Sequence, residues 1–169
     1  YLPLVHVASP SQSLVSIEHT DPQWFNGSVR NGRNMAYETI DVRPMAGALG
    51  AEVFGVDLMD LGDQTFTEIH RALLNHQLLY LDDQPLDDDQ LETLTQRFGP
   101  LGITPFIEGI LDHPDVIEVR KDADEVDTPN FGGRWHSDFS FQEAPPSLTL
   151  LSARLIPKTG GDTLFADMY

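Results

Sequence analysis

Two side chains that could hold a metal ion, His136 and Asp138, lie two residues apart in the sequence. Non-haem iron enzymes bind Fe(II) through two imidazoles and one carboxylate on one face of the metal, and the other coordination positions stay open. Residues i and i+2 of a β-strand point to the same face of a sheet, so this spacing suits two ligands. The pair is the first candidate for a metal site, and an ordinary His–Asp hydrogen bond is the alternative.

The His-x-Asp pattern occurs three times in the sequence, and by itself it is a weak signal, because a chain rich in aspartate has chance matches. The match at His19 lies in a loop-like segment, and the match at His113 has a proline at its centre, which disfavours a strand. The match at His136 lies within residues 135–141, whose side chains alternate in character as in a strand. We therefore interpret only this third match as a metal-ligand pair.

The composition limits the chemistry that the rest of the chain can contribute. Cysteine is absent, so disulfides, thiolate zinc sites and cysteine nucleophiles are excluded, and any metal must bind His, Asp or Glu. The formal net charge of -17 disfavours a nucleic-acid partner, since such a surface repels phosphates. No apolar run is long enough to cross a membrane, and residues 1–10 lack the pattern of a signal peptide. We expect a cytoplasmic protein without a membrane partner.

The chain divides into two parts by composition. Residues 1–38 are rich in the Ser, Asn, Gly and Pro residues that form loops, and we interpret them as an N-terminal leader or arm with little regular structure. Residues 39–169 show regular patterns and form the domain. Two short strands are predicted there near residues 40–45 and 51–56, and a buried strand is predicted at the apolar residues 78–81.

Two helices are predicted in the first half of this domain. Apolar residues recur at helical spacing within residues 64–76 and again within residues 87–98. The second helix has a clear start, because Asp87 can cap it and Gln90 occupies the position of the reciprocal partner in a capping box. A glycine followed by a proline ends it.

Strands dominate the second half of the chain. They are predicted at residues 116–119, 135–141, 148–155 and 163–166, and an acidic loop spans residues 122–133. Because the helices come early and the strands late, the predicted fold class is α+β. The helices are expected to pack on one side of a mainly antiparallel sheet or jelly roll.

The sequence of residues 134–169 resembles the TauD/TfdA family, the taurine and 2,4-dichlorophenoxyacetate dioxygenases and their relatives. Two motifs carry the resemblance, Trp-His-Ser-Asp at residues 135–138 and Gly-Gly-Asp-Thr at residues 160–163. Weaker similarity upstream extends it to about residues 40–169.

The resemblance implies a double-stranded β-helix, or jelly roll, with flanking helices. It implies Fe(II) as cofactor and 2-oxoglutarate as co-substrate, with His136 and Asp138 as catalytic residues and iron ligands. It also implies that Thr163 binds the distal carboxylate of 2-oxoglutarate, and an ordinary β-branched strand residue is the alternative. We interpret Gly160 and Gly161 as a hairpin turn. The implied reaction is hydroxylation of a small organic substrate by O2, with succinate and CO2 as co-products. Halogenating relatives lack the carboxylate that Asp138 supplies, so oxygen insertion is favoured.

Departures from the taurine-type pattern bear on the substrate. Thr104 and Ile107 stand where that type has His and Tyr, and Gly132 stands where it has Asn. Three contacts to taurine are therefore missing, and the resemblance implies another substrate in a more apolar pocket. The candidate substrate residues are Thr104, Phe106, Ile107 and Arg134.

In the family, a second ligand histidine and an arginine for 2-oxoglutarate lie further along the sequence. This sequence ends at Tyr169, before either of them, so we expect it to be part of a longer domain whose jelly roll is incomplete here. The alternative function is a truncated or non-catalytic β-domain that acts as a binding or interaction module. The expected partners of the whole protein are a small-molecule substrate and O2, and a homo-oligomer is left open.

Overall fold

The computed structural model describes residues 4–8, 14–19, 36–102, 104–120, 127, 133–160 and 162–167. The described elements are, in chain order, β1 (Leu4–Ala8), β2 (Leu14–His19), β3 (Asp41–Pro44), β4 (Ala51–Phe54), α1 (Asp63–His76), β5 (Leu78–Leu81), α2 (Asp88–Phe98), β6 (Ile117–Val119) and β7 (Leu148–Ala153). Neither of these helices is long and apolar enough to cross a membrane.

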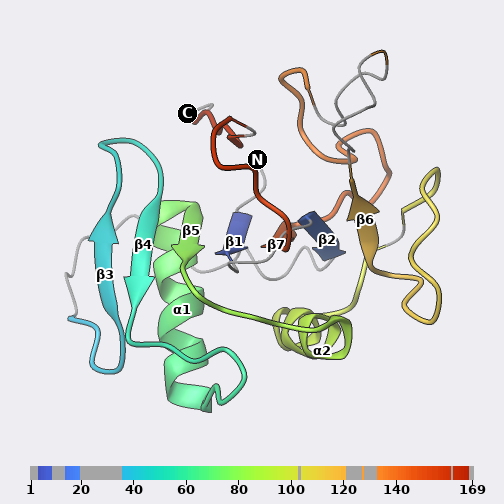
Figure 1. Cartoon of the computed structure of the whole chain (residues 1–169). Helices are drawn as coiled ribbons and strands as arrows, with labels where there is room; N and C mark the ends of the chain where they lie inside the picture. Colours follow the sequence, from blue (N-terminus) through green and yellow to red (C-terminus); the bar gives the residue numbers. More distant parts are fainter. Residues whose placement is uncertain are drawn as a thin grey trace.

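The described strands form one sheet in the order β3-β4-β5-β1-β7-β2-β6 (Figure 1). Three neighbouring pairs are parallel, namely β4 with β5, β5 with β1, and β1 with β7. The pairs β3 with β4, β7 with β2, and β2 with β6 are antiparallel. The α+β class is confirmed. The sheet is mixed, so the prediction of a mainly antiparallel sheet was wrong, and the described residues form an open sheet without the closure of a jelly roll.

The N-terminal segment contributes more structure than its composition suggests. β1 lies between β5 and β7, and β2 lies between β7 and β6. The prediction of little regular structure in residues 1–38 was therefore wrong for these two strands. They are held by pairing with strands far along the chain, and the local composition does not indicate such pairing. The boundary between a leader and a domain at residue 38 stays a prediction.

One hydrophobic core fills the space between the sheet and the two helices. Leu79 of β5 and Leu150 of β7 both lie opposite Val5 in the strand register, so they share a face of the sheet. Both are fully buried and belong to the same core as Leu73 of α1 and Leu91 of α2. α1 contacts β5 and α2 contacts β2. The residues on this face are therefore the ones that hold the helices, and alternate residues point to the opposite face.

Both helices agree with their predicted positions. α1 begins one residue before the predicted range and ends at His76, and α2 follows Asp87. The capping box is confirmed: the Asp87 carboxylate accepts from the backbone N–H of Gln90, and the Gln90 side chain accepts from the backbone N–H of Asp87, both at 2.8 Å.

Two of the late strands were predicted wrongly. Residues 135–137 have no regular structure, residues 138–141 form a turn, and no strand covers residues 163–166. Alternating side-chain character indicates a strand only where another strand is available for pairing, and neither segment has such a neighbour among the described residues. The predictions at residues 78–81, 116–119 and 148–155 are confirmed in type, with the last strand ending at Ala153.

Candidate metal-binding site

His136 and Asp138 come together, although not on a strand. His136 Nε2 lies 3.0 Å from Asp138 Oδ1. The two side chains are 50% and 36% exposed, so a small ion can reach both from solvent. The meeting of the two side chains is produced by the bend of the chain into the turn that begins at residue 138. The role of these two side chains as metal ligands stays a prediction, and the strand given as its reason was wrong.

A backbone carbonyl holds one nitrogen of the His136 imidazole. His136 Nδ1 lies 2.6 Å from the carbonyl oxygen of Arg134. A carbonyl oxygen only accepts hydrogen bonds, so Nδ1 carries a hydrogen. The Asp138 carboxylate is also an acceptor, so without a metal Nε2–H donates to its Oδ1 across the 3.0 Å contact. Histidine ligands of metals characteristically hold their second nitrogen as Nδ1 is held here. A cation such as Fe(II) would take the place of the hydrogen on Nε2.

A buried hydroxyl holds the other side of the Asp138 carboxylate. Thr149 Oγ1 donates to Asp138 Oδ2 at 3.3 Å. Thr149 is only 1% exposed and lies on β7, on the face opposite Leu148 and Leu150 and thus away from the helices. Figure 1 shows the orange segment of residues 133–147 on one side of the central strands and α2 on the other.

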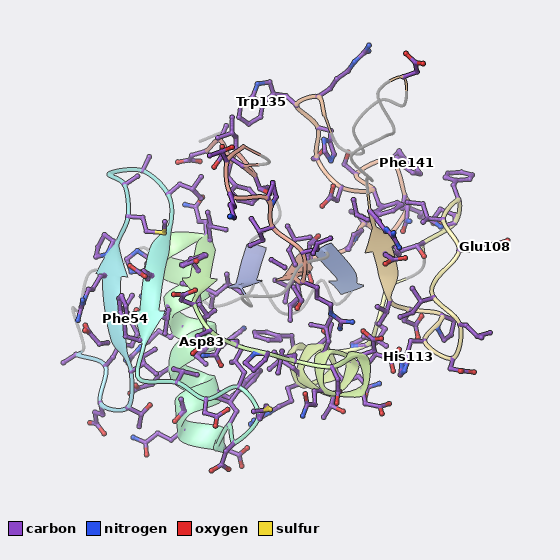
Figure 2. All side chains as sticks on the ribbon, viewed as in Figure 1. Phe54, Asp83, Glu108, His113, Trp135 and Phe141 are labelled. Atoms are coloured by element: carbon purple, nitrogen blue, oxygen red, sulfur yellow. The ribbon has the colours of Figure 1, made fainter. Side chains whose placement is uncertain are left out.

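Aromatic side chains connect the chain after Asp138 with the loop after α2. Phe139 has a φ of 44°, a left-handed conformation that is rare for a bulky residue. The ring centroids of Phe139 and Phe141 lie 6.0 Å apart, and those of Phe141 and Phe106 lie 6.0 Å apart. Figure 2 shows Phe141 beside the loop that carries Glu108. Phe106, a predicted substrate residue, therefore lies near the segment that carries His136 and Asp138.

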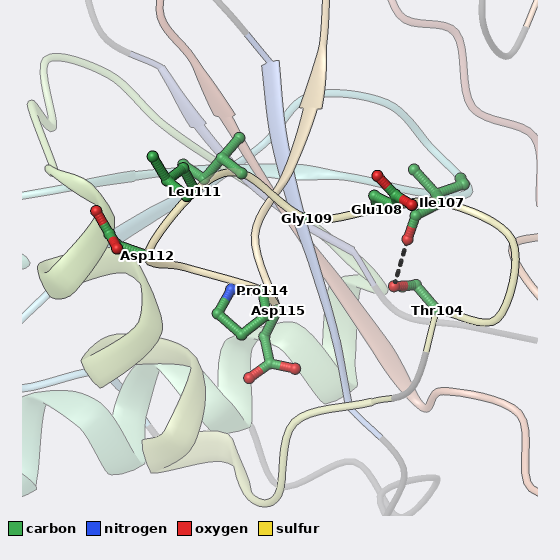
Figure 3. Close-up of a pocket in the computed structure, with 9 residues that line it drawn as sticks. Thr104, Ile107, Glu108, Gly109, Leu111, Asp112, Pro114 and Asp115 are labelled. Atoms are coloured by element: carbon green, nitrogen blue, oxygen red, sulfur yellow. Dashed lines mark hydrogen bonds between the residues drawn. The ribbon is translucent and has the colours of Figure 1, made fainter.

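The other predicted substrate residues are spread over two places. Thr104 and Ile107 line a hollow of about 680 Å³ between the loop after α2 and the turn at residues 109–115 (Figure 3). Thr104 Oγ1 donates to the carbonyl oxygen of Ile107 at 3.4 Å there. His136 and Asp138 do not line this hollow. Arg134 is exposed and contributes its carbonyl oxygen to the site, as described above. The described structure thus does not gather these candidates into one pocket with the ligand pair.

Thr163, the predicted 2-oxoglutarate residue, is exposed in a segment without regular structure. Gly160 before it has a φ of 77°, which glycine adopts readily in turns. Gly132 and Gly161, on which other sequence predictions rested, lie outside the described residues.

A second group of ligand-type residues was not predicted from the sequence. The side chains of Asp89, Glu92 and His113 have potential ligand atoms within 4.8 Å of one another. Within the described ranges, this is the one group of three ligand-type side chains that lie so close together. His113 Nδ1 lies 3.3 Å from Glu92 Oε1. The hydrogen bond to Glu92 raises the pKa of His113 above its ordinary value, and the charges of Glu92, Asp89 and Asp88 add to the effect against a smaller contribution of burial. A protonated His113 paired with Glu92 accounts for this group without a metal. The only signal in the sequence was the i, i+3 spacing of the two acids on a helix.

The chain is similar to several known proteins. The family described as "Taurine catabolism dioxygenase TauD, TfdA family" matches residues 41–169. An (S)-phenoxypropionate/alpha-ketoglutarate-dioxygenase of Sphingobium herbicidovorans is 32% identical over 131 residues, covering 76% of this chain and 45% of the relative. An alkylsulfatase of Acinetobacter baylyi is 33% identical over 135 residues, covering 77% and 40%.

A third relative is an alpha-ketoglutarate-dependent 2,4-dichlorophenoxyacetate dioxygenase of Cupriavidus pinatubonensis. It is 32% identical over 146 residues, which cover 77% of this chain and 50% of the relative. The chain therefore spans half or less of the length of these curated relatives.

Proposed function

This chain belongs to the TauD, TfdA family, and from that membership we propose that the whole protein is an Fe(II)- and 2-oxoglutarate-dependent dioxygenase. In the proposed reaction, O2 and 2-oxoglutarate convert a C–H group of a small organic substrate into C–OH. One oxygen atom enters the substrate and the other enters succinate, and CO2 leaves.

The single observation that carries the proposal is the geometry of His136 and Asp138. His136 Nε2 and a carboxylate oxygen of Asp138 lie 3.0 Å apart, close enough for one metal ion to bind both, on side chains that solvent reaches. Fe(II), when bound, would supply the activation of O2. His136 would supply the neutral ligand, kept in one tautomer by the Arg134 carbonyl, and Asp138 the anionic one. In this proposal the remaining protein ligand comes from a part of the protein beyond these 169 residues.

For the co-substrate we propose Thr163, whose hydroxyl can donate to the distal carboxylate of 2-oxoglutarate. Its exposure supports this role, because a buried hydroxyl could not reach a ligand. A cationic side chain from outside the chain described here would complete the binding, since a carboxylate is held best by charge-assisted hydrogen bonds.

For the substrate we propose an organic anion with an apolar body. The relatives are named for phenoxypropionate, 2,4-dichlorophenoxyacetate and sulfate esters, and each of these combines an acidic group with a carbon body. Thr104 and Ile107 at the positions discussed above argue against taurine. The aromatic rings of Phe106 and Phe141 support an apolar surface near the ligand pair.

The test uses the whole protein with Fe(II) and 2-oxoglutarate under O2. Succinate formation is measured with a panel of aryloxyalkanoates, alkyl sulfates and sulfonates. His136→Ala should abolish substrate-dependent succinate formation and weaken Fe(II) binding in anaerobic calorimetry, because the metal loses a ligand.

His113→Ala is the matched control, since His113 also lies next to carboxylates but has no role in the proposed reaction. It should leave both readouts unchanged. Undiminished turnover in His136→Ala would overturn the assignment. Failure of the unaltered whole protein to bind Fe(II) would favour the alternative, a non-catalytic binding module.

A further inference from the structure

We infer that Thr149 is a positioning residue that fixes the carboxylate of Asp138 for the metal. The inference rests on the proposed function, because it concerns the same ligand pair. It adds a residue from a different part of the chain, eleven positions after Asp138, to the structure of the site.

The two oxygens of the Asp138 carboxylate have different neighbours. Oδ1 faces His136 Nε2 at 3.0 Å, and Oδ2 accepts from Thr149 Oγ1 at 3.3 Å. Rotation of the carboxylate or a change of its side-chain rotamer would break the second contact. The hydroxyl therefore favours the orientation in which Oδ1 points at the position between the two ligands.

The two partners differ in how firmly the fold holds them. Asp138 lies in a turn of a segment that pairs with no strand among the described residues, and its side chain is 36% exposed. Thr149 lies in β7, which is paired on both sides by β1 and β2, and it is 1% exposed. The hydrogen bond from Thr149 therefore restricts the movement of the exposed Asp138 side chain. Second partners of metal ligands act in this way in other metalloproteins.

A purely structural role for the hydroxyl is the competing explanation, since buried polar groups need partners wherever they occur. Thr95 is an example of a buried hydroxyl with a purely structural role. It is 0% exposed on α2, and its Oγ1 donates to the backbone carbonyl of Leu91 at 2.7 Å. Thr149 instead donates to a side chain that the proposed function places on the metal. The two threonines thus provide a matched pair for the experiment.

The experiment measures Fe(II) affinity of the whole protein by anaerobic calorimetry, with melting temperature as a second readout. Thr149→Val keeps the shape and removes the hydroxyl, and it should weaken Fe(II) binding by about tenfold, the lower end of the usual range for second partners, because the bond is long. Thr149→Ser keeps the hydroxyl and should bind Fe(II) within about twofold of the unaltered protein. If Thr149→Val does not fold, Thr149→Ala takes its place, because it introduces no new atoms.

The controls separate the two proposals. Thr95→Val should lower the melting temperature without changing Fe(II) affinity. In an Asp138→Ala background, Thr149→Val should cause no further loss of affinity, because the contact is already absent. Equal affinities of Thr149→Val and the unaltered protein, or equal losses in Thr149→Val and Thr149→Ser, would overturn the role of Thr149 alone. Absence of Fe(II) binding that depends on His136 in the unaltered protein would overturn the proposed function as well.

Discussion

Two neighbours hold the candidate ligand pair: a backbone carbonyl contacts the ring of His136, and a hydroxyl donates to Asp138. The sequence indicated the pair through its spacing, but it gave the wrong geometric reason. A contact between a turn and a strand eleven residues later leaves no local pattern, so Thr149 could not be predicted. Asp89, Glu92 and His113 were missed for the same reason, because the histidine comes from a different segment.

His113 provides a prediction about protonation. The hydrogen bond to Glu92 raises its pKa, so an NMR titration of His113 should give a value above the ordinary one of about 6.5. Since the folded-state pKa is the higher one, the pair stabilises the fold fully below about pH 6.5 and loses this contribution as pH rises through the folded-state value. Glu92→Gln should lower the pKa of His113, and Glu118→Gln, at an exposed position, should not. An unchanged titration in Glu92→Gln would contradict the ion pair.

The elements differ in how far they could be predicted. α2 was predicted closely, because its cap and its apolar spacing lie within one short segment. β1 and β2 were missed because their stability comes from β5 and β7, which lie far away in sequence. Residues 135–141 show the opposite error, an alternating pattern that folds as a turn with Phe139 in a left-handed conformation. Local signals sufficed for the helices and for apolar strands such as residues 78–81, but they failed for β1, β2 and residues 135–141.

The N-terminal cap of α2 gives the prediction at this scale. Asp87→Ala removes the acceptor for the Gln90 N–H and should destabilise the protein by about 1 kcal/mol, measured by denaturant unfolding. Asp87→Asn retains a capping oxygen and should stay within roughly 0.3 kcal/mol of the unaltered protein. Equal destabilisation by both substitutions would show that the charge matters more than the cap.

Glu68 links the chain before β3 to α1 and so bears on the molecule as a whole. Its carboxylate accepts from the backbone N–H groups of Glu38 and Thr39 at 2.9 to 3.0 Å and from the Thr39 hydroxyl at 3.0 Å. Burial pushes the pKa of Glu68 upward, but these hydrogen bonds and the charge of Arg71 outweigh it, so the pKa is lowered. A lowered pKa means that the charged form stabilises the fold.

Glu68→Gln should therefore destabilise the protein at neutral pH by about 1–3 kcal/mol, since a charged acceptor of several hydrogen bonds is lost. The contribution of Glu68 is present above the unfolded-state pKa of about 4.3 and is lost as pH falls through the lower folded-state value. The gap between the two proteins should thus narrow in acid. Unfolding curves between about pH 7 and pH 3 check this. A gap that stays constant with pH would contradict the role of the charge, and Glu143→Gln, at an exposed position, is the control.

The two edges of the sheet formed by the described strands both have features that disfavour self-association. An unprotected edge strand offers free backbone groups to which another chain can add a strand. β3, at one edge, contains Pro44, which has no N–H to donate, and the charged, exposed Arg43 and Asp41. β6, at the other edge, is only three residues long. Each edge thus has a feature that natural sheets use against self-association, and a substitution such as Pro44→Val would remove one of these protections from an otherwise intact fold.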